Sequence, residues 1–398
     1  MKTLIELFDN CQLKNVIAGL NFKPEKIIFV GFKQNMRPQL LNSLEKFFNM
    51  KNIKADIKYE YVSRYDYSSI VERLNNIIDK NEDCCFDLTG GRELVLVAMG
   101  EVSATRKIPM FQFDLKTGEL IHVNNCSSIP LPKKENISIE ECVTLNGGAV
   151  VNPKTDWDMN EEFCKDIYSM WNICKKNPNA WNNNSSVLAS LEKRAFNDMS
   201  LSVGSKIKER DSREIDNSII QSLADCGVIK ELRLQKEYIS FRYKNEQVRK
   251  CLVKSGNVLE LVAYMLTREI SAENNNCYND IKVGVMVDWD GIVNGDIRTS
   301  RDTRNEVDVF LMRGHTPIFV SCKNGAVTKE ALYELESVAE KFGGSFSRKV
   351  LLTTYINRNY SARNFIIQRA KDMKIEIIEG IDKMDREEFK NALAQRVR

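Results

Sequence analysis

The sequence predicts an α/β fold divided into several domains, and three observations carry this prediction. Apolar strand patterns alternate with amphipathic helix patterns over the first third of the chain. Near the other end, two adjacent strand patterns at residues 304–311 and 316–323 lead into a helix pattern at 329–342. The length of 398 residues allows two or three domains at roughly 100–200 residues each.

Composition and charge are those of an ordinary globular protein. Apolar residues make up 43% of the chain and charged residues 28%, which excludes a disordered or fibrous protein. The net charge of +3 does not by itself indicate a nucleic-acid partner, although arginines are frequent in the C-terminal part. The first residues do not resemble a signal peptide and no apolar run has the length of a membrane span, so we expect a cytoplasmic protein without a membrane partner. Eleven cysteines without a Cys-x-x-Cys pair are expected to be buried thiols, and two histidines leave little scope for histidine-based catalysis.

The N-terminal part is expected to be a parallel, doubly wound sheet closed by a hairpin. Its strands are separated by helices, which is the pattern of parallel pairing with crossover helices. The expected strands are residues 25–32, 57–62 and 84–88, the helices 40–48, 67–79 and 92–105, and the hairpin strands 109–113 and 119–123.

The turn Thr89-Gly90-Gly91 stands between an expected strand and an expected helix, where α/β sheets bind ligands. Glycines let a ligand approach the backbone, the threonine hydroxyl is a donor, and the helix start carries partial positive charge. The turn therefore suits a phosphate group, although a tight turn that needs glycine for its shape alone explains it equally well. Neither a G-x-G-x-x-G fingerprint nor a G-x-x-x-x-G-K-[ST] loop is present, which disfavours dinucleotide and NTPase sites.

Residues 151–250 admit two interpretations. An expected helix at 213–224 is followed by a glycine and by a hairpin with strands 228–234 and 238–243. A helix followed by a basic hairpin can belong to a DNA-binding winged helix. Because no clear recognition helix precedes it, we favour a connector that relays the state of one domain to the other.

The C-terminal part brings together residue types that suit metal-dependent phosphodiester hydrolysis. Glu306 and Asp308 lie two residues apart and so project from one face of a strand, while Lys323 ends the next strand. Carboxylates are preferred ligands of hard divalent cations, which polarise a phosphate and activate water. Glu260, in the first turn of an apolar helix, could join them, or could simply complement the helix dipole.

The run Asp87-Leu88-Thr89-Gly90-Gly91-Arg92-Glu93 resembles the signature of the CARF domain, the Rossmann-like sensor of cyclic oligoadenylates in type III CRISPR defence. The resemblance implies a CARF domain at residues 1–150, a cyclic oligoadenylate ligand and a homodimer. A twofold-symmetric cyclic tetranucleotide would fit between two copies of the same loop. The residues that the resemblance places around the ligand are Gly31, Phe32, Lys33, Thr89, Gly90, Gly91, Arg92 and Glu93.

Residues 251–398 resemble the PD-(D/E)XK, or restriction-endonuclease-like, nuclease fold, with a helix, three strands, a helix and a strand in order. The resemblance implies that Asp308, Glu260 and the main-chain carbonyl of Cys322 bind Mn²⁺ or Mg²⁺. Lys323 would orient the attacking water. The family pattern has an acid two residues before this lysine, whereas this chain has Ser321, a weak ligand for which Glu306 could compensate.

Together these patterns predict an endonuclease activated by cyclic oligoadenylate, most readily cyclic tetra-adenylate, with divalent metal as cofactor. RNA, single-stranded DNA and nicked duplex DNA are all open as substrates. The alternative is a ligand-responsive DNA-binding regulator whose nuclease fold is inactive because of Ser321.

Overall fold

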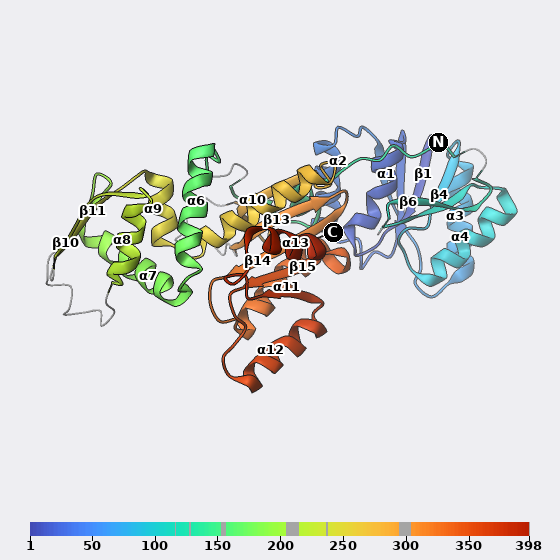
Figure 1. The fold of residues 1–398 in the computed structure, drawn as a ribbon. Coiled ribbons are helices and arrows are strands. Elements are labelled where there is room, and N and C mark those ends of the chain that lie inside the picture. Colours follow the sequence, from blue (N-terminus) through green and yellow to red (C-terminus); the bar gives the residue numbers. More distant parts are fainter. Residues whose placement is uncertain are drawn as a thin grey trace.

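The protein is described here from a computed structural model, which places residues 1–115, 117–126, 129–152, 157–203, 215–235, 238–293 and 304–397. Their strands form three sheets, of six, four and six strands. Figure 1 shows three units in a row, with the unit built mainly from the C-terminal residues between the N-terminal unit and the middle unit of the sequence. Among the described residues, no helix combines the length and apolarity needed to cross a bilayer.

The N-terminal sheet has the order β3-β2-β1-β4-β5-β6 and confirms the predicted α/β class. Every neighbouring pair is parallel except β5 with β6, which form the expected hairpin. The strands are β1 (Thr3–Leu7), β2 (Lys26–Gly31), β3 (Asp56–Tyr61), β4 (Cys84–Asp87), β5 (Met110–Asp114) and β6 (Glu119–Asn124). The sequence prediction missed β1, although it lies at the centre of the sheet, because the strand is short and carries the acid Glu6.

Helices cover both faces of this sheet. The short 3-10 helix η1 and α1 follow β1, and α3 and α4 pack together with Ile5 and Val30 in a separate apolar cluster. The helical segments are η1 (Gln12–Asn15), α1 (Ile17–Phe22), α2 (Pro38–Met50), α3 (Tyr67–Asp79) and α4 (Glu93–Arg106).

The middle unit contains helices and a four-stranded antiparallel sheet of order β10-β11-β9-β8. The predicted hairpin is confirmed by the pairing of β10 with β11. Its preceding helix begins at Asn217 with Asp216 as its cap, so Arg213 and the start of the expected helix lie outside the described residues. The elements are α6 (Glu161–Cys174), α7 (Pro178–Ala195), β8 (Phe196–Asn197), β9 (Ser200–Val203), α8 (Asn217–Asp225), β10 (Ile229–Gln235), β11 (Tyr238–Tyr243) and α9 (Glu246–Val253).

The C-terminal sheet has the order β16-β15-β14-β13-β12-β7, with β14, β15 and β16 parallel and the other pairs antiparallel. Helix α10 packs in one apolar cluster with Val309 and Leu311, while α11 packs in a second with Phe310 and Phe319. The strands are β7 (Ala149–Val150), β12 (Asp280–Asp288), β13 (Arg304–Arg313), β14 (Thr316–Lys323), β15 (Arg348–Thr353) and β16 (Ile375–Glu379). The helical segments are α5 (Ile139–Leu145), α10 (Asn257–Glu273), α11 (Lys329–Gly343), η4 (Gly344–Phe346), α12 (Tyr360–Asp372) and α13 (Arg386–Val397).

Helix α5 and strand β7 precede residue 151 but pack with the C-terminal sheet. Val150 pairs with Val287 at the edge of that sheet, and the Cys142 thiol donates to the Phe342 carbonyl of α11 at 3.2 Å. The boundary expected at residue 150 falls after these elements and stays a proposal. The expected boundary at residue 250 stays a proposal.

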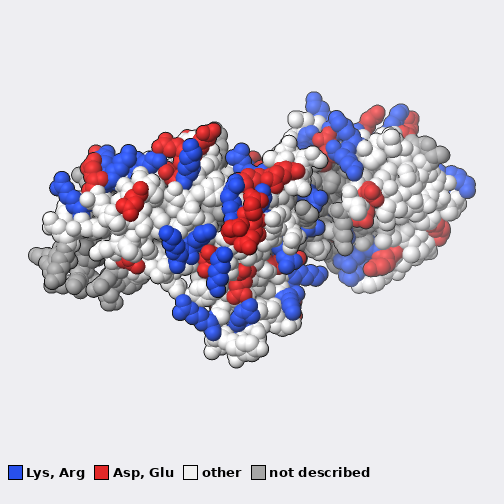
Figure 2. Space-filling model, in the orientation of Figure 1, with Lys and Arg blue, Asp and Glu red and all other residues white. Residues whose placement is uncertain are grey.

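The charged surface is mixed rather than uniformly basic on the face shown. Figure 2 shows acidic side chains gathered in a band over the C-terminal unit, with lysines and arginines on either side of it. This agrees with the small net charge of +3.

Candidate active site

The candidate active site lies where β13 and β14 separate. Their antiparallel pairing runs from Arg313 with Thr316 as far as Val309 with Val320. Just beyond the last pair, a carboxylate oxygen of Asp308 accepts a hydrogen bond from the Cys322 backbone N–H at 2.6 Å and lies 3.3 Å from the Ser321 hydroxyl. The Asp308 side chain thus satisfies the β14 backbone where the strands have diverged.

The side chains of β13 do not alternate regularly between the two faces of the sheet around Asp308. Val307 packs in the cluster that contains α11, whereas Val309 packs in the cluster that contains α10. The two valines therefore lie on different faces of the sheet, although residues two apart in a regular strand share one face. Across the sheet, Gly284 lies opposite Asp308 between two regular pairs and has a positive φ of 62°. Such a conformation favours glycine, and an irregular strand is a common means of aiming a side chain into a site.

Glu260 enters the site from the first turn of α10. It is only 6% exposed, and its ion pair with Lys254 is as long as 4.0 Å. Burial, with Asp308 beside it, raises the pKa of Glu260 to about 8, and Lys254 and Lys323 oppose this rise. Burial also raises the pKa of Asp308, against the opposing effects of Lys323 and the Cys322 N–H. The two acids expected to act together therefore lie close enough to repel each other, as mutual pKa effects require.

Glu306 is engaged by a lysine that sequence reasoning missed. The ammonium of Lys254 lies 2.8 and 2.9 Å from the two carboxylate oxygens of Glu306 and 4.0 Å from an oxygen of Glu260. In this arrangement Lys254 contacts both oxygens of Glu306, and the expected compensation for Ser321 stays a prediction. Lys254 follows α9 in an ordinary polar loop, so only its place three residues before α10 could have drawn attention to it.

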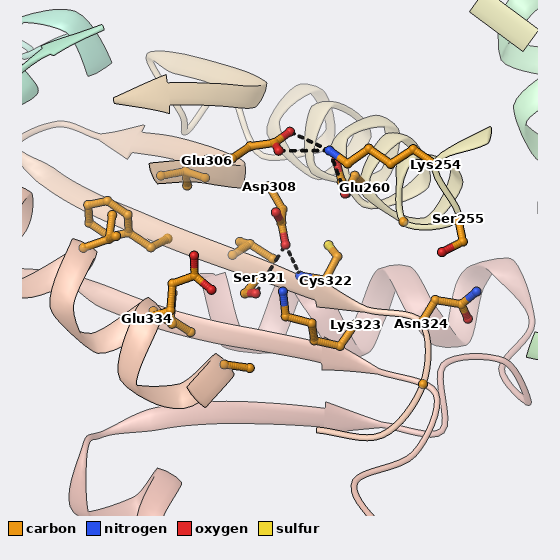
Figure 3. Close-up of a pocket in the computed structure, with 18 of the residues that line it drawn as sticks. Lys254, Ser255, Glu260, Glu306, Asp308, Ser321, Cys322, Lys323, Asn324 and Glu334 are labelled. Atoms are coloured by element: carbon orange, nitrogen blue, oxygen red, sulfur yellow. Dashed lines mark hydrogen bonds and ion pairs between the residues drawn. The ribbon is translucent and has the colours of Figure 1, made fainter. Parts of the chain in front are cut away.

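These side chains open into one pocket of about 440 Å³. Figure 3 shows Asp308 directed toward Ser321 and Cys322, with Lys323 beside them and Glu334 on the opposite wall. Glu334 comes from α11 and was not predicted, since it is one of several acids on an amphipathic helix; it accepts a 3.3 Å hydrogen bond from Asn305. Asn324 also lines the pocket, directly after Lys323.

The donor atoms of this pocket suit a hard divalent cation. Burial raises the pKa of the Cys322 thiol well above its ordinary value, so its sulfur stays protonated and oxygen atoms remain as the available ligands. Two repelling carboxylates, Asp308 and Glu260, would each gain from a positive ion between them. Nevertheless, within the described part of the chain, no three His, Cys, Asp or Glu side chains already form a metal cluster.

The expected sensor site is built around the chain segment that follows β1. The loop after β2, with Gly31, Phe32 and Lys33, and the turn after β4 lie on opposite sides of this segment, because β1 separates β2 from β4. A Cβ atom on Gly31 would lie 2.9 Å from Phe8 Cβ, and one on Gly90 would lie 2.9 Å from Asp9 Cβ. The sequence prediction missed the segment because it missed β1 itself.

Asp9 holds the turn Thr89-Gly90-Gly91, the predicted phosphate-binding turn, by a hydrogen bond. One of its oxygens accepts from the Gly91 N–H at 3.1 Å and pairs with the Lys14 ammonium at 3.2 Å. Gly91 has a φ of 107°, and a Cβ there would lie 2.5 Å from Leu7 Cβ. The glycine is therefore required by the turn's own packing, whatever ligand binds. Arg92 and Glu93, which follow it, are exposed.

The Thr89 hydroxyl does not serve as the free donor that was expected. It donates to a carboxylate oxygen of Asp87 and accepts from the Phe113 N–H at 2.8 Å. Asp87 is 1% exposed, and burial raises its pKa to about 7 even though Thr89 donates to it from both the hydroxyl and the backbone. The hydroxyl is thus part of the internal structure that supports the turn.

The chain is similar to known proteins in the sequence of its C-terminal part and in its overall fold. The family described as "Card1-like, endonuclease domain" matches residues 245–398. The crystal structure of protein VC1899 from Vibrio cholerae is similar with a TM-score of 0.75 and 18% identity, over 99% of this chain and 97% of that one. The structure of Can2 from Sulfobacillus thermosulfidooxidans, in complex with cyclic tetra-adenylate, is similar with a TM-score of 0.67 and 16% identity, over 100% of this chain and 99% of that one.

No curated protein matches the sequence. Residues 245–398 nevertheless have the Card1-like endonuclease domain's pattern, and at these identities the two solved structures establish the fold of the whole chain. Residues 245–398 thus match the Card1-like endonuclease domain, and the chain has, over its full length, the fold of the VC1899 and Can2 structures.

Proposed function

We propose that this protein is an endonuclease that requires a divalent metal and is switched on by a cyclic oligoadenylate in type III CRISPR defence. The observation that carries the proposal is the convergence of Asp308, Glu260 and Lys323 on one pocket at the parting of β13 and β14. The family match of this domain supports nucleic-acid cleavage.

The residues of the pocket divide into those that would hold the metal and one that would act on water. Asp308 and Glu260, with the Cys322 carbonyl, would hold Mn²⁺ or Mg²⁺. When bound, such an ion polarises a phosphodiester and lowers the pKa of a coordinated water. Lys323 would position the attacking water and stabilise the negative charge that develops on the phosphate.

The activator is proposed to bind at the carboxyl ends of β2, β1 and β4. The loop with Gly31, Phe32 and Lys33 and the turn from Thr89 to Glu93 would contact it, and Asp9 would hold that turn in place. The Can2 structure, which contains cyclic tetra-adenylate, supports a cyclic tetramer as the first candidate.

We also propose a homodimer, in which two sensor units would face one cyclic ligand. The outer side of α4 supports this idea: Val97 is 61% exposed, and a Cβ on Gly100 would meet nothing within 4 Å. An apolar residue this open on a helix next to a ligand site is suited to a partner surface.

A cleavage assay with each component left out in turn tests the proposal. The full chain is incubated with labelled single-stranded RNA, single-stranded DNA or supercoiled plasmid, with and without Mn²⁺ and cyclic tetra-adenylate. Cleavage that requires both additions is the expected result. Cyclic hexa-adenylate, added in the same way, shows whether ring size decides activation.

A second candidate function is a ligand-responsive DNA-binding regulator with an inactive nuclease fold. Ser321 in place of an acid, and the occupation of both Glu306 oxygens by Lys254, are the observations in its favour. A ligand-dependent mobility shift of duplex DNA without any cleavage would favour this function over the endonuclease.

A further inference from the structure

Lys254 lies close to two of the four acids that line the pocket in the described part of the chain. Its ammonium contacts both oxygens of Glu306 and approaches Glu260, as Figure 3 shows. Lys323 acts on the opposite side, where it opposes the rise in the pKa of Asp308. The carboxylate cluster is therefore neutralised from two sides by lysines.

Lys254 places a positive charge between Glu306 and Glu260, next to the proposed metal ligands Asp308 and Glu260. An ammonium and a divalent ion are attracted by the same carboxylate oxygens, and they repel each other at such distances. While Lys254 is paired as observed, Glu306 has no oxygen free of it, which agrees with the lack of a ready-formed acid cluster in the described part of the chain.

We propose that Lys254 is a positioning residue that holds Glu306 and sets the affinity of the site for its divalent cation. Displacement of the ammonium from Glu306 and Glu260 would free the Glu306 carboxylate to turn toward the metal site at Asp308 and Glu260. The inference rests on the proposed metal-dependent activity, which it deepens.

The place of Lys254 in the chain links this contact to the middle unit. Lys254 directly follows α9, whose Val248 and Cys251 are buried in the cluster that also contains residues of α7 and α10. Gly256, the residue before α10, would place a Cβ 2.9 Å from an oxygen of Glu260. The lysine therefore lies in the three-residue junction, residues 254–256, between α9 of the middle unit and the helix that carries Glu260, so a shift of α9 would move the ammonium relative to the acids.

The test is calorimetric titration of the metal-free full chain with Mn²⁺, comparing the wild type with Lys254→Met. Removing the competing charge is expected to tighten Mn²⁺ binding roughly three- to tenfold. Lys254→Arg, which keeps a cation able to pair with Glu306, should retain the wild-type affinity. Structural damage would weaken binding instead, so tightening is not a result that a merely structural role produces.

Lys250→Met is the matched control, since it removes the same charge four residues earlier, where the ammonium lies over the Trp157 ring. It should leave Mn²⁺ affinity unchanged. Unchanged or weaker binding by Lys254→Met, with a wild-type melting temperature, would overturn the inference.

Asp308→Asn separates this inference from the proposed function. If Asp308→Asn abolishes Mn²⁺ binding while Lys254→Met leaves it unchanged, the metal site stands and the role of Lys254 is wrong. If neither substitution alters the affinity, both the metal site and the role of Lys254 are wrong.

Discussion

At the scale of single residues, the nuclease pocket is defined by acids that are held where water cannot fully solvate them. Glu260 is 6% exposed, and Asp308 is fixed by the Cys322 N–H rather than by a cation. Such an arrangement stabilises the protonated acids in the metal-free protein and favours a divalent ion once one is present.

The pH dependence of stability tests the environment of Glu260. Its folded pKa of about 8 lies above the ordinary value of 4.5, so the folded protein binds the proton more tightly than the unfolded chain. This contribution to stability is complete below the ordinary value and is lost as the pH rises to about 8. Glu260→Gln removes the titrating group while Asp308, Glu306, Lys254 and Lys323 remain around it.

In urea unfolding with a chelator, the stability of the Gln variant relative to the wild type should increase as the pH is raised from 4.5 to about 8. We expect a relative gain on the order of 1–3 kcal/mol. A difference between the two proteins that does not change with pH would contradict the assigned environment.

Thr89 provides a second residue-scale prediction. Thr89→Val removes the hydroxyl that donates to Asp87 and accepts from the Phe113 N–H, leaving two buried partners without it. The free energy of unfolding should fall by roughly 1–3 kcal/mol. Thr89→Ser, which keeps the hydroxyl, should recover most of the loss, and Thr105→Val on exposed α4 surface should cost less than Thr89→Val.

At the scale of elements, both sites depend on how strands end. In the N-terminal unit, β1 brings Asp9 to the turn after β4, and in the C-terminal unit the separation of β13 from β14 opens the pocket. Neither feature is an isolated motif: each is created by strands that meet at one edge of a sheet.

Local sequence patterns predict single elements of this molecule but not the way in which the elements meet. Local patterns correctly predicted β4, α4, β13, β14 and α11, because the apolar residues in each segment recur with the spacing of a strand or a helix. It could not predict that β1 pairs between β2 and β4, nor that Lys254 reaches Glu306 across 52 residues of sequence. Those contacts depend on pairing and chain direction, which local patterns do not encode.

The turn between β4 and α4 gives an element-scale prediction. Gly91→Ala forces a side chain into a positive φ and against Leu7, so it should destabilise the protein by at least ~2 kcal/mol and prevent binding of cyclic tetra-adenylate. Gly100→Ala, in the interior of α4 with nothing within 4 Å, is the control for stability and should stabilise the helix by about 0.5–1 kcal/mol. Equal effects of the two substitutions in denaturant unfolding would contradict the role given to the turn.

At the scale of the whole molecule, one apolar cluster joins the sensor to the nuclease unit. It contains Phe47 and Phe48 of α2, Val143 of α5, and Phe310 and Phe342 of the C-terminal unit. A continuous buried cluster resists separation of the two units. Ligand binding to the N-terminal unit should therefore change the stability of the C-terminal unit as well.

Tryptophan fluorescence can detect this coupling because all four tryptophans lie after residue 150. One of them, Trp289, packs against Phe342 with ring centroids 5.9 Å apart. Cyclic tetra-adenylate should raise the melting temperature reported by tryptophan, although the ligand is proposed to bind a unit that has none. A ligand-induced rise seen by calorimetry but not by tryptophan fluorescence would mean that the units unfold independently.

The most direct test of the central claim is the rate at which Asp308→Ala cleaves labelled single strands with Mn²⁺ and cyclic tetra-adenylate. Our account predicts a loss of at least about a hundredfold relative to the wild type, with ligand binding retained and with Glu330→Ala, an exposed acid at the start of α11, as active as the wild type. Undiminished cleavage by Asp308→Ala would contradict the assignment of the pocket between β13 and β14 as the active site.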